Sequence, residues 1–304
     1  SDKLLIKLLN YMYYNIDLFN TIKGFTKLSK AVQLHAVTLS NTFLDQIPYA
    51  DDDVKLHAVK HYGLAIRCIK NPTKEMKLEA VKTNGAALEY IKNPTKEMEL
   101  EAVKNNSSSI RYIKIQSEEL QLISVKYDSN NIEYIKTPTD KVCKIAITDN
   151  GYLINKIDNP SVELQLISVK QYGEHLRYIK NPCNDAIDEA LKNTASAICY
   201  VENATDKQKW YALDNNNDGE SSYIDMVRMM HGLTDDMKLH AVTKFGKCIT
   251  VIDNPSIQLQ QIAVKYDTDV LDNLEEYSQS VAIKACEDNI HAIKYVNKPS
   301  AELV

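Results

Sequence analysis

Apolar positions along this chain recur with a period of 22 residues. Residues 71–92 read NPTKEMKLEAVKTNGAALEYIK, residues 93–114 read NPTKEMELEAVKNNSSSIRYIK, and residues 115–136 read IQSEELQLISVKYDSNNIEYIK. In each stretch, apolar residues at positions i, i+4 and i+5 mark one face of a helix of about a dozen residues. The AALEYIK-type stretch that follows has apolar residues three apart, which predicts one or two turns of α or 3-10 helix.

The proline of the NPTKE phrase gives a fixed point for counting each repeat, and we call its place the Pro position. Successive Pro positions are 22 residues apart, except for one step of 29 between Ala204 and Leu233, which predicts a seven-residue insertion. Proline occupies the position at Pro72, Pro94, Pro138, Pro160, Pro182, Pro255 and Pro299, and another residue does so at Leu28, Ala50, Gln116, Ala204, Leu233 and Tyr277.

Eight residues after the Pro position the chain always carries Ala or Ser, and we call this place the small-residue position. A small side chain lets a neighbouring helix approach to an interaxial distance of roughly 8–10 Å. One repeat alone buries too little apolar surface to offset the entropy of ordering its backbone, so the repeats must stack. The residues are Ala36, Ala58, Ala80, Ala102, Ser124, Ala146, Ser168, Ala190, Ala212, Ala241, Ala263 and Ala285.

These patterns predict an all-α fold: a right-handed α-solenoid of about twelve 22-residue helix-turn-helix repeats, each pairing an α-helix with a second α or 3-10 helix. The Asn-Pro-Thr/Ser phrase predicts a helix start with Pro at the first helical position and either Asn or Thr/Ser as the N-cap. Glycines after the helix, at Gly85, Gly151, Gly173 and Gly246, are expected to end it in the left-handed conformation.

The chain divides into an N-terminal capping helix region at 1–24 and a continuous repeat array at 25–304, with the insertion near 214–225 and a partial last repeat. The N-terminal KLLIKLLNYMYYNIDLF reads as a helix rather than a signal peptide. No apolar run approaches the roughly 18 residues that a membrane span needs. Six cysteines without a CxxC pair argue against a zinc cluster or a disulfide framework, so we expect a cytoplasmic setting.

The NPxxExxLxAVKxNGxxIxYIK phrase resembles short two-helix tandem repeats, of the domain-of-unknown-function type, found in bacterial and in phage or large-virus proteins. It is more loosely similar to leucine-rich-repeat variant and HEAT-like α-solenoids. The resemblance covers about residues 25–304 and implies a solenoid with a binding role and no catalytic residues. The chain departs from the phrase at Gln116, Ala204, Leu233 and Tyr277 in the Pro position, and at Lys144 and Asp188 where Leu is usual.

Tyrosine and basic residues recur on the short second helix, and we call this set the short-helix row. Tyrosine stands four residues before the Pro position, either to cover the neighbouring repeat or to bind a partner. Charged residues stand five and two before it, and beyond Pro182 the same positions hold Glu202, Asp253, Asp272 and Glu275, with Lys294. The row comprises Arg67, Lys70, Tyr90, Lys92, Arg111, Tyr112, Lys114, Tyr134, Lys136, Arg177, Tyr178, Lys180 and Tyr200, with Lys156, Tyr295 and the acids Glu89, Glu133 and Asp158 in the same columns.

The leading functional prediction is a non-enzymatic scaffold that recognises a protein or peptide along the short-helix row, with an acidic partner as one expectation. The alternative is a nucleic-acid binder that stacks bases on tyrosine and neutralises phosphates with Arg and Lys. Two further readings are a solvated face that keeps the protein soluble and a HEAT-like enzyme on nucleic acid, which would need residues brought together by the curvature of the array. The net charge of −5 argues against indiscriminate nucleic-acid binding. No Ser-His-Asp, HExxH, P-loop or paired-carboxylate arrangement emerges, so no enzyme is predicted.

The insertion contains DNNNDGESSYID at residues 214–225, which resembles an EF-hand calcium loop. Asp at the twelfth position in place of Glu, and Ser221 in place of an apolar residue, depart from that pattern. A bound Ca²⁺ is one expectation and a solvated Asn/Asp-rich loop is the other; no further cofactor is expected. The candidate ligands are Asp214, Asn216, Asp218, Glu220 through its backbone carbonyl, and Asp225.

Overall fold

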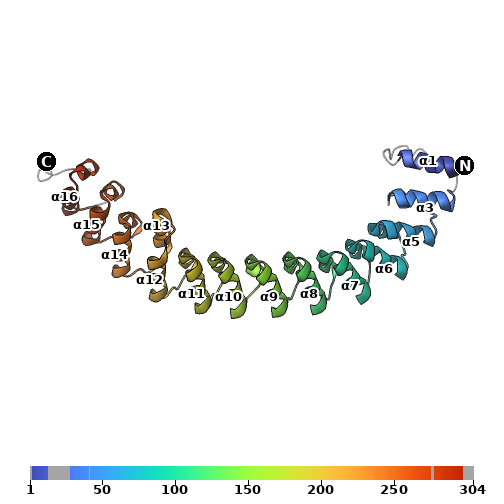
Figure 1. Ribbon diagram of the computed structural model, residues 1–304, viewed down its shortest axis with the longest axis horizontal. Helices are drawn as coiled ribbons and strands as arrows, with labels where there is room; N and C mark the ends of the chain where they lie inside the picture. The colour runs from blue at the N-terminus through green and yellow to red at the C-terminus, as the bar shows by residue number, and fades with distance from the viewer. Residues whose placement is uncertain (1, 13–27, 41, 275–276, 297–304) are drawn as a thin grey trace. The chain divides into compact units, whose positions relative to one another are not determined.

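The computed structural model describes residues 2–12, 28–40, 42–274 and 277–296. Every regular element in these ranges is an α-helix or a 3-10 helix, which confirms the all-α solenoid prediction (Figure 1). The chain forms two compact units, residues 1–156 and 157–304, and each is described by itself. The right-handed sense of the array and its continuity across the unit boundary stay predictions.

In the first unit a ten-residue α-helix is followed by a six-residue 3-10 helix in each regular repeat. Each α-helix packs beside the next α-helix, and each 3-10 helix beside the next 3-10 helix. The elements are α1 (Asp2–Met12), α3 (Lys30–Leu39), α4 (Thr42–Asp45), α5 (Asp52–His61), η1 (Gly63–Cys68), α6 (Lys74–Thr83), η2 (Gly85–Tyr90), α7 (Lys96–Asn105), η3 (Ser107–Tyr112), α8 (Glu118–Tyr127), η4 (Ser129–Tyr134), α9 (Asp140–Asp149) and η5 (Gly151–Lys156).

The second unit follows the same order with one exception, because the insertion replaces a short 3-10 helix by the full helix α13. The elements are α10 (Val162–Gln171), η6 (Gly173–Tyr178), α11 (Asn184–Asn193), η7 (Ala195–Tyr200), α12 (Asp206–Asn215), α13 (Glu220–Met229), α14 (Asp235–Lys244), η8 (Gly246–Val251), α15 (Ile257–Tyr266), η9 (Thr268–Asn273), α16 (Gln279–Asp288) and η10 (Ile290–Tyr295).

The predicted ends of the array are only partly covered. Helix α1 packs against α3, and the Asp2 carboxylate accepts a hydrogen bond from Ser29 Oγ at 2.7 Å. Residues 13–24 of the predicted capping region and the partial last repeat at 297–304, including Pro299, lie outside the described residues. No helix among the described residues is long and apolar enough to cross a membrane.

The small-residue position is the innermost point of every repeat. All twelve alanines and serines that the sequence places there have 0% of their surface exposed. The next residue is also buried in most repeats, as at Val81 and Val103, both 0% exposed. This burial confirms the register of the repeat as counted from the Pro position.

The glycines that follow the α-helices have a different role from the predicted one. Positive φ angles occur only at Gly219 and Gly232 among the described glycines, so the left-handed helix ending expected at Gly85, Gly151, Gly173 and Gly246 is wrong. A Cβ atom on Gly85 would lie 2.3 Å from the carbonyl oxygen of Ala102, the small residue of the next repeat. Glycine is needed because the backbone of one repeat touches the backbone of the next.

In most repeats the N-terminal cap of the α-helix is a Thr or Ser one residue after the Pro position. Thr73 Oγ1 accepts a hydrogen bond from the Met76 amide at 3.2 Å, and Thr95 Oγ1 from the Met98 amide at 3.3 Å. The preceding proline therefore lies one residue outside the cap, which corrects its predicted placement at the first helical position. The hydroxyl pairs one of the four amides that a helix start leaves unsatisfied.

Side-chain amides tie consecutive repeats together. Asn105 Nδ2 donates to the Lys82 carbonyl at 2.8 Å, while its Oδ1 accepts from the Gly85 amide at 2.7 Å. Asn193 makes the same two bonds to Lys170 and Gly173, at 3.2 and 3.1 Å. Each asparagine thus satisfies backbone groups at the end of the preceding α-helix, where intrahelical partners are lacking.

Replacing Ala80 by Leu should lower the free energy of unfolding by about 1–3 kcal/mol, because the larger side chain overpacks a fully buried contact. Urea unfolding followed by circular dichroism measures the change. Lys82→Leu puts the same side chain on an exposed position of the same helix and should change stability by about 0.5 kcal/mol at most. Equal effects of the two variants would contradict the assigned register.

Gly85→Ala should change the free energy of unfolding in the direction opposite to that of most Gly→Ala substitutions. An alanine at an unstrained position usually stabilises a protein by about 0.4–1 kcal/mol, because it restricts the unfolded chain. Here we expect destabilisation, because the new Cβ would lie 2.3 Å from the Ala102 carbonyl oxygen. A urea midpoint at or above the wild-type value would show that the repeats do not meet so closely.

Candidate functional site

The short-helix row of the first unit is assembled from consecutive 3-10 helices. Tyr90, Tyr112 and Tyr134 are the last residues of η2, η3 and η4, which pack side by side. A lysine follows two residues after each tyrosine, on the bend that leads to the next α-helix. The structure therefore brings the predicted residues of this unit into one row, one set per repeat.

Four lysines in this row are exposed and form no ion pair with a described residue. They are Lys70, Lys92, Lys114 and Lys136, which occupy the same position in successive repeats. In the described part of the chain none of their ammonium groups has an acidic partner within ion-pair distance, whereas Lys82 and Lys104 on the α-helices pair with Glu79 and Glu101 at 3.4 and 3.2 Å. We call these four residues the lysine column.

The neighbouring column, five residues before the Pro position, alternates in charge through Arg67, Glu89, Arg111 and Glu133. The Arg111 guanidinium lies 3.9 Å from the centroid of the Tyr134 ring in the next repeat. Its Nε also donates to the Ser108 carbonyl at 3.0 Å. This column contributes to the packing of one repeat on the next as well as to the surface.

The tyrosines mainly serve contacts between repeats. Tyr90 is 44% exposed, but Tyr112 and Tyr134 are half-buried. Burial, with the Glu89 carboxylate as a further cause, raises the pKa of Tyr112. A hydrogen bond with Glu133, together with burial, raises the pKa of Tyr134. The rings of Tyr112 and Tyr134 are therefore partly covered.

The second unit repeats the arginine–tyrosine contact with fewer free charges. The Arg177 guanidinium lies 4.8 Å from the Tyr200 ring centroid and 5.8 Å from that of Tyr178, and its Nη1 is 3.9 Å from Glu174. Burial, with Glu174 nearby, raises the pKa of Tyr200. Lys180 is exposed, as is the opposing Asp158. Among the predicted row residues of this unit, Arg177 contacts Tyr200 and Glu174, and Lys180 is exposed.

The predicted calcium loop is split between two helices. Asp214 lies in α12, with its carboxylate 3.3 Å from His240 Nε2, and Asp225 lies in α13, paired with Arg228 at 2.5 Å. Gly219 has a φ of 97°, as the turn of such a loop requires, and α13 begins at Glu220. Among the described residues no three His, Cys, Asp or Glu side chains are placed to hold a metal ion. Calcium binding stays a prediction that this geometry does not support.

The buried side chain of Asn216 is part of the same loop. Its Oδ1 accepts a hydrogen bond from the Asp218 amide at 3.1 Å, and its Nδ2 lies 3.3 Å from Met226 Sδ. Asn216 therefore folds the turn against α13 instead of facing an ion.

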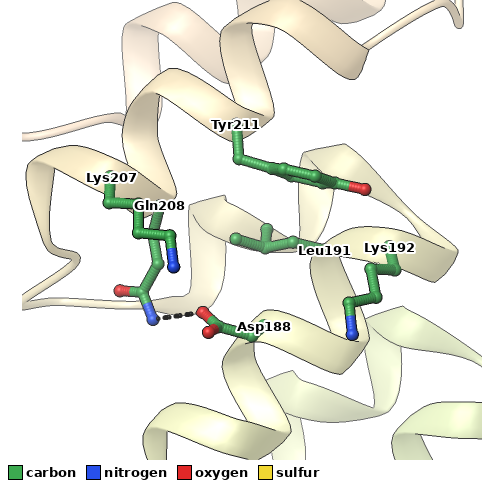
Figure 2. A pocket seen from close by; sticks show the side chains of 6 residues that line it. All are labelled: Asp188, Leu191, Lys192, Lys207, Gln208 and Tyr211. Carbon is green, nitrogen blue, oxygen red and sulfur yellow. Dashed lines mark hydrogen bonds between the residues drawn. The ribbon is translucent and has the colours of Figure 1, made fainter.

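A cleft between α11 and α12, which sequence analysis missed, has a volume of about 350 Å³ (Figure 2). Gln208 Nε2 donates to Asp188 Oδ1 at 2.8 Å, and Gln208 Oε1 accepts from the Thr205 amide at 3.0 Å. Figure 2 shows the Tyr211 ring and Leu191 forming an apolar wall above this polar pair. The cleft is wide enough for a side chain of a partner.

The origin of this cleft lies in two departures from the repeat. Asp188 stands where other repeats carry Leu78, Leu100 or Leu122, and Gln208 stands where they carry Met76 or Met98. Sequence reasoning identified Asp188 as unusual but did not find its partner. A search for polar residues at buried positions of adjacent repeats would have found both.

The six cysteines are free thiols. Burial raises the pKa of Cys143 and Cys199 to about 11 and that of Cys248 to about 12. These three side chains stay protonated near neutral pH and are weak nucleophiles, since the thiolate is the reactive form.

Asp188→Leu alone should destabilise the second unit by about 1–3 kcal/mol, because it leaves the buried Gln208 amide without its acceptor. Adding Gln208→Met removes that unpaired donor and restores the apolar pair of other repeats. The double variant should regain wild-type stability or exceed it in urea unfolding. A double variant as unstable as the single one would show that the polar pair does not cause the effect.

Comparison of the chain with protein-family models, with curated proteins and with solved structures returned no match. The resemblance of the repeat phrase to short two-helix tandem repeats therefore stays a prediction from the sequence.

Proposed function

We propose that this chain is a non-enzymatic binding scaffold that recognises an acidic protein or peptide along the short-helix row of its first unit. The observation that carries the proposal is the lysine column, whose four exposed ammonium groups share one register and lack acidic partners among the described residues. The six free thiols support a cytoplasmic setting for this activity.

Charge complementarity favours an anionic partner. The chain as a whole carries a net charge of −5, so a column of four lysines without an ion-pair partner among the described residues is a local exception to its acidic character. Such a patch increases the association rate and selects partners of opposite charge more than it raises affinity. Neighbouring lysines one repeat apart lie within about one Debye length, which is ~8 Å at physiological ionic strength, so they act partly together.

The tyrosines favour a protein or peptide over a single-stranded nucleic acid. Sequence-tolerant binding of single strands relies on aromatic faces that are free to stack on bases. Arg111 covers the Tyr134 ring, Arg177 covers the Tyr200 ring, and Tyr112 is half-buried. The lysines remain available, whereas Tyr134 and Tyr200 each have an arginine against the ring, so the row does not offer an unbroken series of free rings for stacking.

The test measures fluorescence anisotropy of a labelled twelve-residue polyglutamate peptide with wild type and with a variant carrying Gln at all four positions of the lysine column. Each exposed ion pair contributes about 0.2–1 kcal/mol, so we expect affinity to fall by roughly tenfold or more. A control variant carries Gln in place of Lys74, Lys96, Lys126 and Lys141, which are exposed on the α-helices. These four substitutions remove the same total charge.

Equal losses in the two variants, or no binding of the peptide at low salt, would refute the proposal. Labelled single-stranded and duplex oligonucleotides are measured in parallel. Binding of oligonucleotides alone, with a steep decline in affinity as salt rises, would establish the nucleic-acid alternative instead.

A further inference from the structure

We propose that the lysine column selects an extended acidic peptide in the polyproline II conformation, with an acidic residue at every third position. The inference rests on the proposed function and specifies the partner's backbone geometry. It follows from the spacing that stacked helical repeats are expected to have.

Close backbone contacts fix the first two of the three steps in the column, and the third step has Ser107 in place of the glycine. The small residue is fully buried in every repeat, and Gly63 and Gly85 meet the next repeat so closely that a Cβ would lie 2.4 and 2.3 Å from its carbonyl oxygen. Helices packed through such small residues are about 8–10 Å apart. Carried out to the surface, this spacing predicts intervals of about 9 Å between Lys70, Lys92, Lys114 and Lys136.

A polyproline II helix has three residues per turn and rises 3.1 Å per residue, so every third side chain returns to the same face after about 9.3 Å. A β-strand places alternate side chains on one face at intervals of about 6.6–6.8 Å, which does not match a 9 Å step. An α-helix comes near this step only at every seventh residue, after about 10.5 Å, and such positions drift by about 20° per heptad.

The surface beside the lysine column also suits this conformation. Tyr90 is 44% exposed beside the lysine column, and Tyr112 and Tyr134, at the same place in the next two repeats, are half-buried. Peptides in the polyproline II conformation dock on surfaces lined with aromatic side chains and lose little entropy on binding, because they are already extended. The four lysines span three steps, which corresponds to about ten residues of such a peptide.

The experiment compares two labelled peptides of identical composition and charge by fluorescence anisotropy. One is (Glu-Pro-Ala)₄, with Glu at every third position, and the other is Glu-Pro-Glu-Pro-Glu-Pro-Glu-Pro-Ala-Ala-Ala-Ala, with Glu at every second. We expect the first to bind at least tenfold more tightly to wild type. We expect the difference to disappear in the variant with Gln at all four lysines, whose helicity and urea midpoint should match those of wild type.

Two further probes separate this inference from the proposed function. Equal binding of both peptides would overturn the spacing rule while leaving an acidic-peptide scaffold intact. Tighter binding of an alanine-rich helical peptide with Glu at every seventh position would overturn the polyproline II conformation. If neither peptide, polyglutamate nor the helical probe bound at low salt, the proposed function and this inference would both fail.

Discussion

The close approach of consecutive repeats at the small-residue position is the constraint on which the rest of the structure depends. There, the carbonyl of a fully buried Ala faces a glycine of the preceding repeat, with no room for another carbon atom in the pairs Gly63–Ala80 and Gly85–Ala102. Because the contact involves backbone and Cβ atoms, it determines the step between these repeats without limiting the side chains outside it. The surface columns stay in register for this reason.

The period, the all-helical class and the buried small residues could be predicted from the sequence, because each produces a repeated apolar pattern. The role of Gly85 could not, since a left-handed helix end and a close backbone approach both require glycine at that place. The bond from Asn105 to Lys82 was equally hidden, because a polar residue at a helix end looks solvated until the neighbouring repeat is placed. Such contacts depend on how one repeat packs against the next, and the sequence of a single repeat does not reveal that packing.

In the candidate site, too, some features could be predicted from the sequence and others became visible only in the structure. Counting from the Pro position identified the lysine column without a structure, because charge and register are both visible in the sequence. The use of Arg111 to cover Tyr134 became clear only when η3 and η4 were placed side by side. Residues 214–225 match the sequence pattern of a calcium loop. In the structure, however, the first and last carboxylates of this segment, Asp214 and Asp225, lie beside His240 and Arg228.

The described hydrogen bonds between repeats, such as those of Asn105 and Asn193, reach only to the adjacent repeat. Stability in such an array is approximately a sum of local terms, so a whole block of 22 residues can be gained or lost without rearranging the others. Each duplication or deletion by unequal recombination would then add or remove one cation from the column. The length of the binding surface would then change in whole repeats, by 22 residues at a time.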